Sequence, residues 1–214
     1  MGRRALPKID PQVDLAGHLR LVDDLLEPFD PQSLFPKPQP LEIEIGSGKG
    51  LFVLQQSQRN EDRNYLGNEI AKKYAQFAAF RLAQHDRPNA RMVSGDGLLM
   101  FQKLLPDECC IAVHVYFPDP WWKRNHRRRR VLRQPLIADI ERVLKPGGEL
   151  HFWTDVEQYF EESLKLIDLH STLIGPESVP ESAPENDMDF RTHFERRMRM
   201  HGHAVFRSRF SKAQ

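Results

Sequence analysis

Cysteine is scarce in this chain of 214 residues, which has only Cys109 and Cys110. Because the two are adjacent, they make a poor structural disulfide and a poor metal site. No His and Cys spacing elsewhere resembles a zinc site, so we predict no bound metal. A chain that does without disulfides suits a reducing compartment, and we expect a cytoplasmic protein.

Long apolar runs are also missing. No stretch approaches the roughly 20 apolar residues that a membrane-spanning helix requires. The first residues, 1–7, are not followed by the apolar stretch of a secretory signal. Internal repeats are absent as well, which argues against a solenoid. We therefore expect no membrane partner and no repeat architecture.

Net charge is only +1, but the charges are unevenly distributed. Between Asp119 and Lys145 there are nine Lys and Arg residues and three Asp and Glu residues. A second basic cluster lies at 191–212, and an acidic, proline-bearing segment at 175–187 separates the two. A near-zero total therefore does not exclude a polyanionic partner such as nucleic acid.

The length and composition are those of one α/β domain, with 40% hydrophobic and 29% charged residues. Residues 1–40 contain seven prolines and little periodicity, which predicts an irregular arm with one short helix near 15–26. Residues 41–214 form the predicted domain, with the acidic segment 175–189 as a flexible loop.

From residue 41 onward, strand patterns alternate with helix patterns. This alternation predicts a doubly wound, Rossmann-like α/β fold with a mostly parallel sheet, covered on both faces, and an antiparallel last strand. The run 145–148, Lys-Pro-Gly-Gly, predicts a helix end and a turn before a strand. The predicted strands are 41–45, 64–68, 91–94, 111–116, 148–154 and 204–210, and the predicted helices are 49–59, 71–84, 97–104, 134–144, 156–167 and 192–200.

A glycine turn follows the first of these strands. Gly46, Gly48 and Gly50 lack side chains that would keep a ligand away from the backbone. The later glycine of the dinucleotide fingerprint is missing, and no Walker Lys-Ser/Thr pair follows. The turn predicts a nucleotide-like ligand, although glycines can also serve only a tight turn and helix packing.

Acidic residues lie in or after three successive strands. Glu69 is placed to accept both ribose hydroxyls of a nucleoside, and Asp96 to accept an adenine amine. Glu44 is unusual inside an apolar strand and could reach a cationic amino group. Alternatively, Glu44 is a solvated edge-strand residue and Asp96 caps the helix that begins at Gly97. The pattern resembles class I S-adenosylmethionine-dependent methyltransferases, which implies S-adenosyl-L-methionine as the cofactor.

The segment 116–130 combines an acid, aromatic rings and cations. Asp119 lies between two prolines, where it is either a reactive carboxylate or an Asx-turn residue. Trp121 and Trp122 follow and could stack on a base or plug the core. The arginines at 127–130 indicate phosphate contacts, with a solvated helix face as the alternative.

Three motifs together resemble the bacterial tRNA (guanine-N(7)-)-methyltransferase family, over about residues 41–210. They are Phe-Pro-Asp-Pro-Trp at 117–121, Trp-Thr-Asp at 153–155 and Thr-His-Phe-Glu at 192–195. The resemblance implies methyl transfer from S-adenosyl-L-methionine to N7 of guanine in tRNA, forming 7-methylguanosine at guanosine 46 of the variable loop. It implies tRNA as the partner, and we predict no obligate protein partner.

The resemblance also implies residue roles. Asp119 would be the catalytic residue and would contact the cofactor. The implied cofactor-binding residues are Glu44, Gly46, Gly48, Glu69, Asp96 and Asp119. The implied substrate contacts are Lys123, Asp155, Thr192, His193, Phe194 and Glu195, and the implied RNA contacts are Asn125, His126, Arg127, Arg128, Arg129 and Arg130.

Structural alternatives stay open for part of this set. Asp155 could cap the helix that begins at Val156, and Thr192 with Glu195 forms a Thr-x-x-Glu capping box. Trp122, Arg124 and Asn125 vary the usual loop, and the strand after 201–203 is unusually rich in arginine. These differences from the family pattern affect the expected contacts with RNA more than the expected reaction.

Two other functions share features with this sequence. An adenine or cytosine amino-methyltransferase would carry a proline-containing loop at the same place, but it has no role for Asp155 or the tail motif. A non-catalytic RNA-binding module would need a damaged cofactor site, yet Gly46, Glu69 and Asp119 are all present. The enzyme interpretation is favoured.

Overall fold

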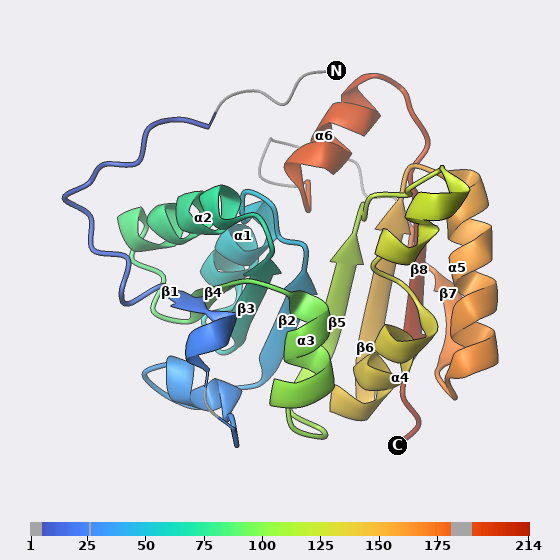
Figure 1. Cartoon of the computed structure of the whole chain (residues 1–214), viewed down its shortest axis with the longest axis horizontal. Coiled ribbons are helices and arrows are strands. Elements are labelled where there is room, and N and C mark those ends of the chain that lie inside the picture. Colours follow the sequence, from blue (N-terminus) through green and yellow to red (C-terminus); the bar gives the residue numbers. More distant parts are fainter. Residues whose placement is uncertain (1–5, 26, 181–189) are drawn as a thin grey trace.

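The computed structural model describes residues 6–25, 27–180 and 190–214. Its centre is an eight-stranded sheet in the order β1-β4-β3-β2-β5-β6-β8-β7 (Figure 1). The first six strands in this order are parallel, while β8 is antiparallel to both β6 and β7. The strands are β1 Leu19–Leu21, β2 Leu41–Ile45, β3 Asn64–Glu69, β4 Ala90–Ser94, β5 Cys110–Tyr116, β6 Leu144–Thr154, β7 Ile174–Ser178 and β8 Phe206–Ser211.

Helices cover both faces of the sheet (Figure 1). The helices are α1 Leu51–Arg59, α2 Lys72–Gln84, α3 Gly97–Leu99, α4 Gln134–Val143, α5 Glu157–His170 and α6 His193–Met200. A π-helical turn, Met100–Leu104, continues α3, and a 3-10 helix, Arg124–Arg129, precedes α4. The α6 helix lies above the sheet, over the ends of the central strands.

Two apolar cores result from the alternation of side chains along the strands. Ile43 and Ile45 of β2 belong to the larger core, together with residues of α4 and α5. Phe52 of α1 and Ala78 of α2 form the smaller core on the opposite face. Strand β2 is buried at all five positions because it lies between β3 and β5 and is covered on both faces.

Strand order reverses between β2 and β5, since the chain first builds outward to β4 and then returns. In open α/β sheets, ligands bind at the carboxyl ends of the strands beside such a reversal. The topology therefore directs attention to the loops that follow β2, β3, β4 and β5.

Most predicted elements of the domain are confirmed, including the antiparallel strand near the carboxyl terminus. Strand β6 begins at Leu144, earlier than predicted, and its pairing with β5 is irregular, because Cys110 pairs with Leu144 and Ala112 with Glu149. The segment 97–104 forms one α turn followed by a π turn rather than a regular helix.

The predicted helix near 15–26 is wrong. Residues 19–21 form β1, which pairs with β4, and a short 3-10 turn, Val22–Asp24, follows. A three-residue strand is too short to show periodicity, and its pairing with a distant strand determines its structure. The division into an arm at 1–40 and a domain at 41–214 stays a prediction, although β1 joins the sheet.

The acidic loop predicted at 175–189 is wrong at its start, because Ile174–Ser178 is strand β7. All five of its residues are exposed, so it has no apolar alternation that could reveal it. Pairing with β8 and the ion pair between Glu177 and Arg209 hold it in place. Residues 181–189 lie outside the described part of the chain.

Candidate functional site

The glycine turn after β2 opens toward empty space. Gly46 and Gly48 have φ values of 78° and 54°, which a residue with a side chain rarely adopts. A Cβ atom added to either would meet nothing within 4 Å. Gly50 differs, because its Cβ would lie 2.6 Å from the Cβ of Ala78 in α2. The first two glycines therefore expose backbone to a ligand, while Gly50 lets α2 pack against the turn.

Glu69 at the end of β3 holds the turn in shape. Its Oε2 accepts a hydrogen bond from the backbone N–H of Gly48 at 2.8 Å, and its Oε1 accepts one from Ala71 at 2.8 Å. A carboxylate has about four acceptor positions, so Glu69 keeps capacity for ligand hydroxyls.

Asp96 after β4 caps the next helix, as one of its two interpretations predicted. Its Oδ1 accepts hydrogen bonds from the N–H groups of Leu98 at 2.8 Å and Leu99 at 3.4 Å. The side chain is nevertheless exposed at the carboxyl edge of the sheet. Capping and ligand contact are compatible here, because both cap bonds use one oxygen.

Glu44 is the most isolated acid of the site. It is 2% exposed, and its Oε2 has no hydrogen-bond partner among the described residues. Burial raises its pKa to about 8, a hydrogen bond from Ser47 opposes the rise and the charge of Glu69 adds to it. The alternative of a solvated edge residue is wrong, because β2 is a central strand.

Asp119 lies in the loop after β5 at the rim of a hollow of about 390 Å³. The hollow is lined by Asp119, Pro120, Trp121, Trp122, Lys123 and His126. The Asp119 side chain is exposed, and no hydrogen bond to it is found within the described ranges. Its Asx-turn alternative therefore finds no support, and the carboxylate is available to a ligand.

The backbone around Asp119 is strained. Phe117 and Trp121 have φ values of 49° and 41°, in the left-handed region that costs a side-chain-bearing residue about 1–3 kcal/mol. Such a conformation persists only where surrounding contacts hold it. One such contact joins the N–H of Phe117 to the carbonyl of Trp153 in β6 at 2.8 Å.

The two tryptophans lie outside the core, so their interpretation as core plugs is wrong. Trp122 is 57% exposed. Trp121 is half-buried, with its ring 5.7 Å from that of His126 and 5.2 Å from the Arg129 Cζ. Both rings border the hollow beside Asp119.

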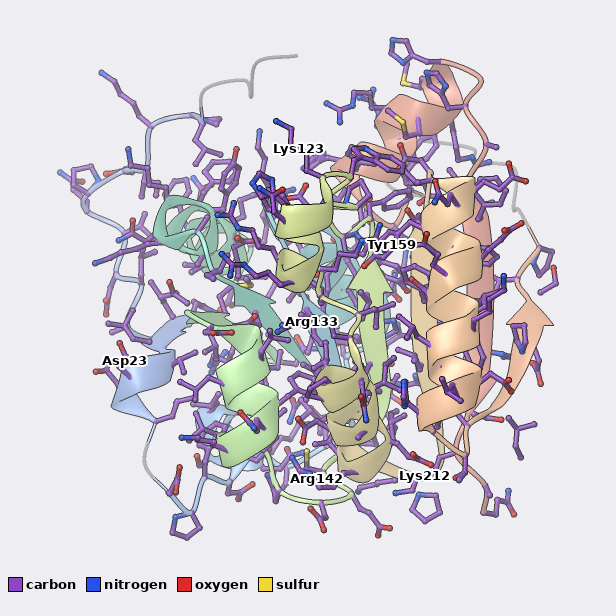
Figure 2. All side chains as sticks on the ribbon, turned by 45° about the vertical axis from the view of Figure 1, so that its right-hand side comes forward. Asp23, Lys123, Arg133, Arg142, Tyr159 and Lys212 are labelled. Carbon is purple, nitrogen blue, oxygen red and sulfur yellow. The ribbon has the colours of Figure 1, made fainter. Side chains whose placement is uncertain are left out.

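Arg130 corrects the expectation that the whole arginine run faces RNA. It is 7% exposed, its Nε donates to the Pro120 carbonyl at 2.7 Å, and its Nη1 pairs with Glu162 at 2.5 Å. Its Cζ lies 4.7 Å from the Tyr159 ring centre, and Figure 2 shows Tyr159 on α5 and Lys123 at the upper surface. Tertiary packing turns the Arg130 side chain inward. There it links the Asp119 loop to α5.

The neighbouring cations differ from Arg130. Asn125, Arg128 and Arg129 are exposed, and His126 is half-buried. The side chain of Arg127 lies outside the described part of the structure. The described part of the segment therefore presents cations to solvent beside the hollow.

The tail motif lies next to the Asp119 loop. The ring of Phe194, in the first turn of α6, is 5.0 Å from that of Phe117. His193 is exposed, with its Nε2 3.4 Å from the Nη1 of Arg81. The structure thus brings together motifs about 75 residues apart in sequence.

Thr192 and Glu195 make the predicted capping interaction. The Thr192 Oγ1 accepts from the N–H of Glu195 at 3.0 Å, while the Glu195 carboxylate accepts from the N–H of Arg191 at 2.7 Å. Glu195 is 2% exposed and also pairs with Arg199 and Arg207 at 3.4 and 3.3 Å. Its carboxylate is therefore occupied by the protein.

Asp155 is not a helix cap. The N–H of Val156 is bonded by Thr154 Oγ1 at 3.3 Å, and α5 begins without a side-chain cap. The half-buried Asp155 carboxylate, at the carboxyl end of β6, has no hydrogen-bond partner in the described ranges. It stays available to a substrate.

A buried polar network beneath α1 was missed in the sequence. Glu42 accepts hydrogen bonds from His114 Nε2 at 2.8 Å and Arg63 Nη1 at 2.7 Å. Burial opposes its ionisation, but His114 and Arg63 outweigh burial and lower its pKa to about 2. Burial lowers the pKa of His114 to about 4, so a neutral ring donates to Glu42 and accepts from the Tyr116 hydroxyl. The only sign of this network in the sequence was the presence of polar residues that alternate with apolar ones in buried strands.

Lys49 and Arg81 were also missed. Arg81 Nη1 donates to the Lys49 carbonyl at 3.1 Å, which places a cation from α2 beside the glycine turn. Lys49 lies within the glycine turn, but Arg81 belongs to no motif, and only helix packing brings it to the turn. Among the described residues, no helix could cross a membrane and no His, Cys, Asp and Glu cluster could hold a metal.

Known proteins resemble this chain along most of its length. A family model described as "Putative methyltransferase" matches residues 38–208. A tRNA (guanine-N(7)-)-methyltransferase from Rhodopirellula baltica is 48% identical over 99% of this chain and 80% of that protein. Another from Dechloromonas aromatica is 33% identical over 88% of this chain and 76% of that protein.

A solved structure shares the fold. It is a variant of the 16S rRNA (adenine(1408)-N(1))-methyltransferase from Catenulisporales acidiphilia with its cosubstrate SAM, with a TM-score of 0.57 and 15% identity. The match covers 82% of this chain and 86% of that one. At this identity the likeness shows the fold alone, which is the Rossmann-like methyltransferase fold. The family model and the sequence relatives show that the chain is a methyltransferase and belongs to the tRNA (guanine-N(7)-)-methyltransferase family.

Proposed function

We propose that this protein transfers a methyl group from S-adenosyl-L-methionine to N7 of guanine in tRNA, at guanosine 46 of the variable loop. The names of its relatives support the reaction. The observation that carries the proposal is the meeting of the glycine turn, the Asp119 loop and the α6 motif at one edge of the sheet.

The donor site fits this cofactor. Glu44 has a buried oxygen without a partner, which suits the ammonium of the methionine part. Gly46 and Gly48 leave open backbone, Glu69 keeps acceptor capacity for ribose hydroxyls, and Asp96 would meet the adenine. When bound, S-adenosyl-L-methionine supplies an electrophilic methyl group on a positively charged sulfur.

The acceptor needs little help from acid–base chemistry. Guanine N7 already carries an in-plane lone pair, so no proton has to leave it and no general base is required. Positive charge develops on the purine, and Asp119 would stabilise that charge or orient the base through its N–H groups. Alignment of the reacting atoms by the loop supplies the larger contribution.

The remaining proposed contacts divide into base and backbone contacts. Asp155 has a free carboxylate and would accept from the guanine edge, and Lys123 lies at the hollow. The residues that would contact the RNA backbone are Asn125, His126, Arg128 and Arg129. Arg130 would not contact it, because its side chain is buried. Thr192 and Glu195 would act by holding α6, which places His193 and Phe194.

The test is incubation with labelled S-adenosyl-L-methionine and unmodified tRNA, followed by nucleoside analysis. We expect 7-methylguanosine, and none from a tRNA whose guanosine 46 is replaced by adenosine. Asp119→Ala should lower the rate by about 100- to 1000-fold without loss of stability. Asp168→Ala, an exposed acid on α5, is the matched control. Methylated adenine, or full activity in Asp119→Ala, would contradict the proposal.

A further inference from the structure

The side chains of Arg81 and His193 meet beside the backbone of Lys49, where the glycine turn, α2 and α6 come together, and the charge of Lys49 acts on His193. Arg81, in the last turn of α2, donates to the Lys49 carbonyl at 3.1 Å and lies 3.4 Å from His193 Nε2. The close packing of Gly50 against Ala78, one turn earlier in α2, gives Arg81 this reach.

The group lacks a counter-ion. Among the described residues, no carboxylate lies within ion-pair distance of Lys49 or Arg81. Although the His193 side chain reaches solvent, partial burial of its ring together with the charges of Arg81, Lys49 and Arg196 lowers its pKa to about 4. Burial also lowers the pKa of Arg81. Like charges held together at a partly buried place are costly unless an anion joins them.

The position of the group suggests which anion. The first turn of α6 contacts Arg81 through His193 and the Asp119 loop through Phe194 and Phe117. The group therefore borders the same mouth as Asp119, but on the side of the glycine turn. A guanine held beside Asp119 has phosphates on both sides, and Arg128 and Arg129 lie on the loop side only.

We propose that Lys49, Arg81 and His193 form a binding site for a backbone phosphate of the RNA substrate. The site rests on the proposed function, since it needs an RNA whose guanine enters the mouth. Arginine in a fixed position suits phosphate because its N–H groups make paired hydrogen bonds, and Lys49 adds a point charge. His193 then contacts the backbone rather than the base.

The test measures binding of an unmodified tRNA to the full-length protein at several KCl concentrations. Arg81→Gln and Lys49→Gln should each weaken binding roughly five- to tenfold near physiological salt, and reduce the slope of log K against log [salt] by about one. Donor affinity, measured by calorimetry, and the methylation rate at saturating tRNA should stay close to those of the unmodified protein.

Lys103→Gln is the matched control, because it removes an exposed cation from the turn after α3, away from α6 (Figure 1). Should Arg81→Gln fail to fold, Lys49→Gln decides, since only the Lys49 backbone is used by Arg81. Unchanged RNA affinity and salt slope would overturn the site, and so would a loss confined to donor affinity. If the parent protein binds tRNA but forms no 7-methylguanosine, the proposed function fails while the binding data still judge the site.

Discussion

Glu42 and Glu44 lie two residues apart on the same face of β2, and they occupy opposite electrostatic environments. Glu42 is bonded by His114 and Arg63, which lower its pKa to about 2 despite burial. Glu44 has an oxygen with no partner, and burial raises its pKa to about 8. The charge of the first residue is compensated within the protein, whereas one oxygen of the second finds no partner among the described residues.

The same contrast holds between the interior and the carboxyl edge of the sheet. Arg130 is buried and bonded to Pro120 and Glu162, whereas the Asp119 and Asp155 carboxylates have no partner in the described ranges. Folding alone selects for satisfied charges, because an unpaired buried group costs stability. The unpartnered carboxylates thus lie at the carboxyl edge, where solvent or a ligand can reach them.

Removal of Glu42 should cause the largest loss of stability. Glu42→Ala leaves the buried N–H of His114 and the hydroxyl of Tyr65 without an acceptor, and should cost about 2–3 kcal/mol of unfolding free energy. Urea denaturation at pH 7 measures this. Glu44→Gln should instead raise the unfolding free energy at pH 7, by about 3 kcal/mol, because the neutral amide avoids the cost of keeping the Glu44 carboxyl protonated above its ordinary pKa. Equal losses in both variants would break the contrast.

Replacement of Arg130 should show that some residues of the Asp119 loop position it for catalysis whereas others bind tRNA. Arg130→Leu removes the bond to Pro120 and frees a strained loop, so kcat should fall about 10- to 100-fold with little change in tRNA affinity. Arg129→Gln is the matched neighbour and should weaken tRNA binding and its salt dependence instead. Single-turnover rates and binding isotherms distinguish the two. If Arg130→Leu lost RNA affinity while kcat stayed unchanged, Arg130 would instead be a residue that contacts RNA.

The last prediction concerns the dependence of stability on pH. A carboxyl whose folded pKa is raised stabilises the fold most at pH values below its ordinary pKa, and the stability is lost as the pH rises to the folded value. Glu44 should therefore make unfolding free energy fall between about pH 4.5 and pH 8, by up to about 1.4 kcal/mol per pH unit. Glu42 acts in the opposite sense, and its contribution is lost as the pH falls from about 4.5 toward 2.

Glu44→Gln should remove the decline above pH 5 and leave the acid limb of Glu42 unchanged. Denaturation curves at a series of pH values, without donor, test this. An unchanged decline in Glu44→Gln would show that Glu44 is ionised in the free protein.

Much of the domain was predictable because its signals are local. Five strands from β2 to β6 are apolar runs bounded by glycine, proline or acidic residues, and their helices follow at regular spacing. β1 and β7 were not predictable, because three and five residues at the edges of a sheet need no apolar pattern. Their structure comes from pairing with β4 and β8.

The sequence by itself determined the order of strands and helices, the glycine turn and the motif around Asp119, since these depend on residue type and short spacing. Only the tertiary structure decided which charged groups have partners within the protein. It turned Arg130 inward, bound Glu195 to Arg199 and Arg207, and gathered Lys49, Arg81 and His193 from three elements. Compensation of a charge depends on neighbours within a few ångströms, and such neighbours can lie 72 positions apart in the chain, as Glu42 and His114 do.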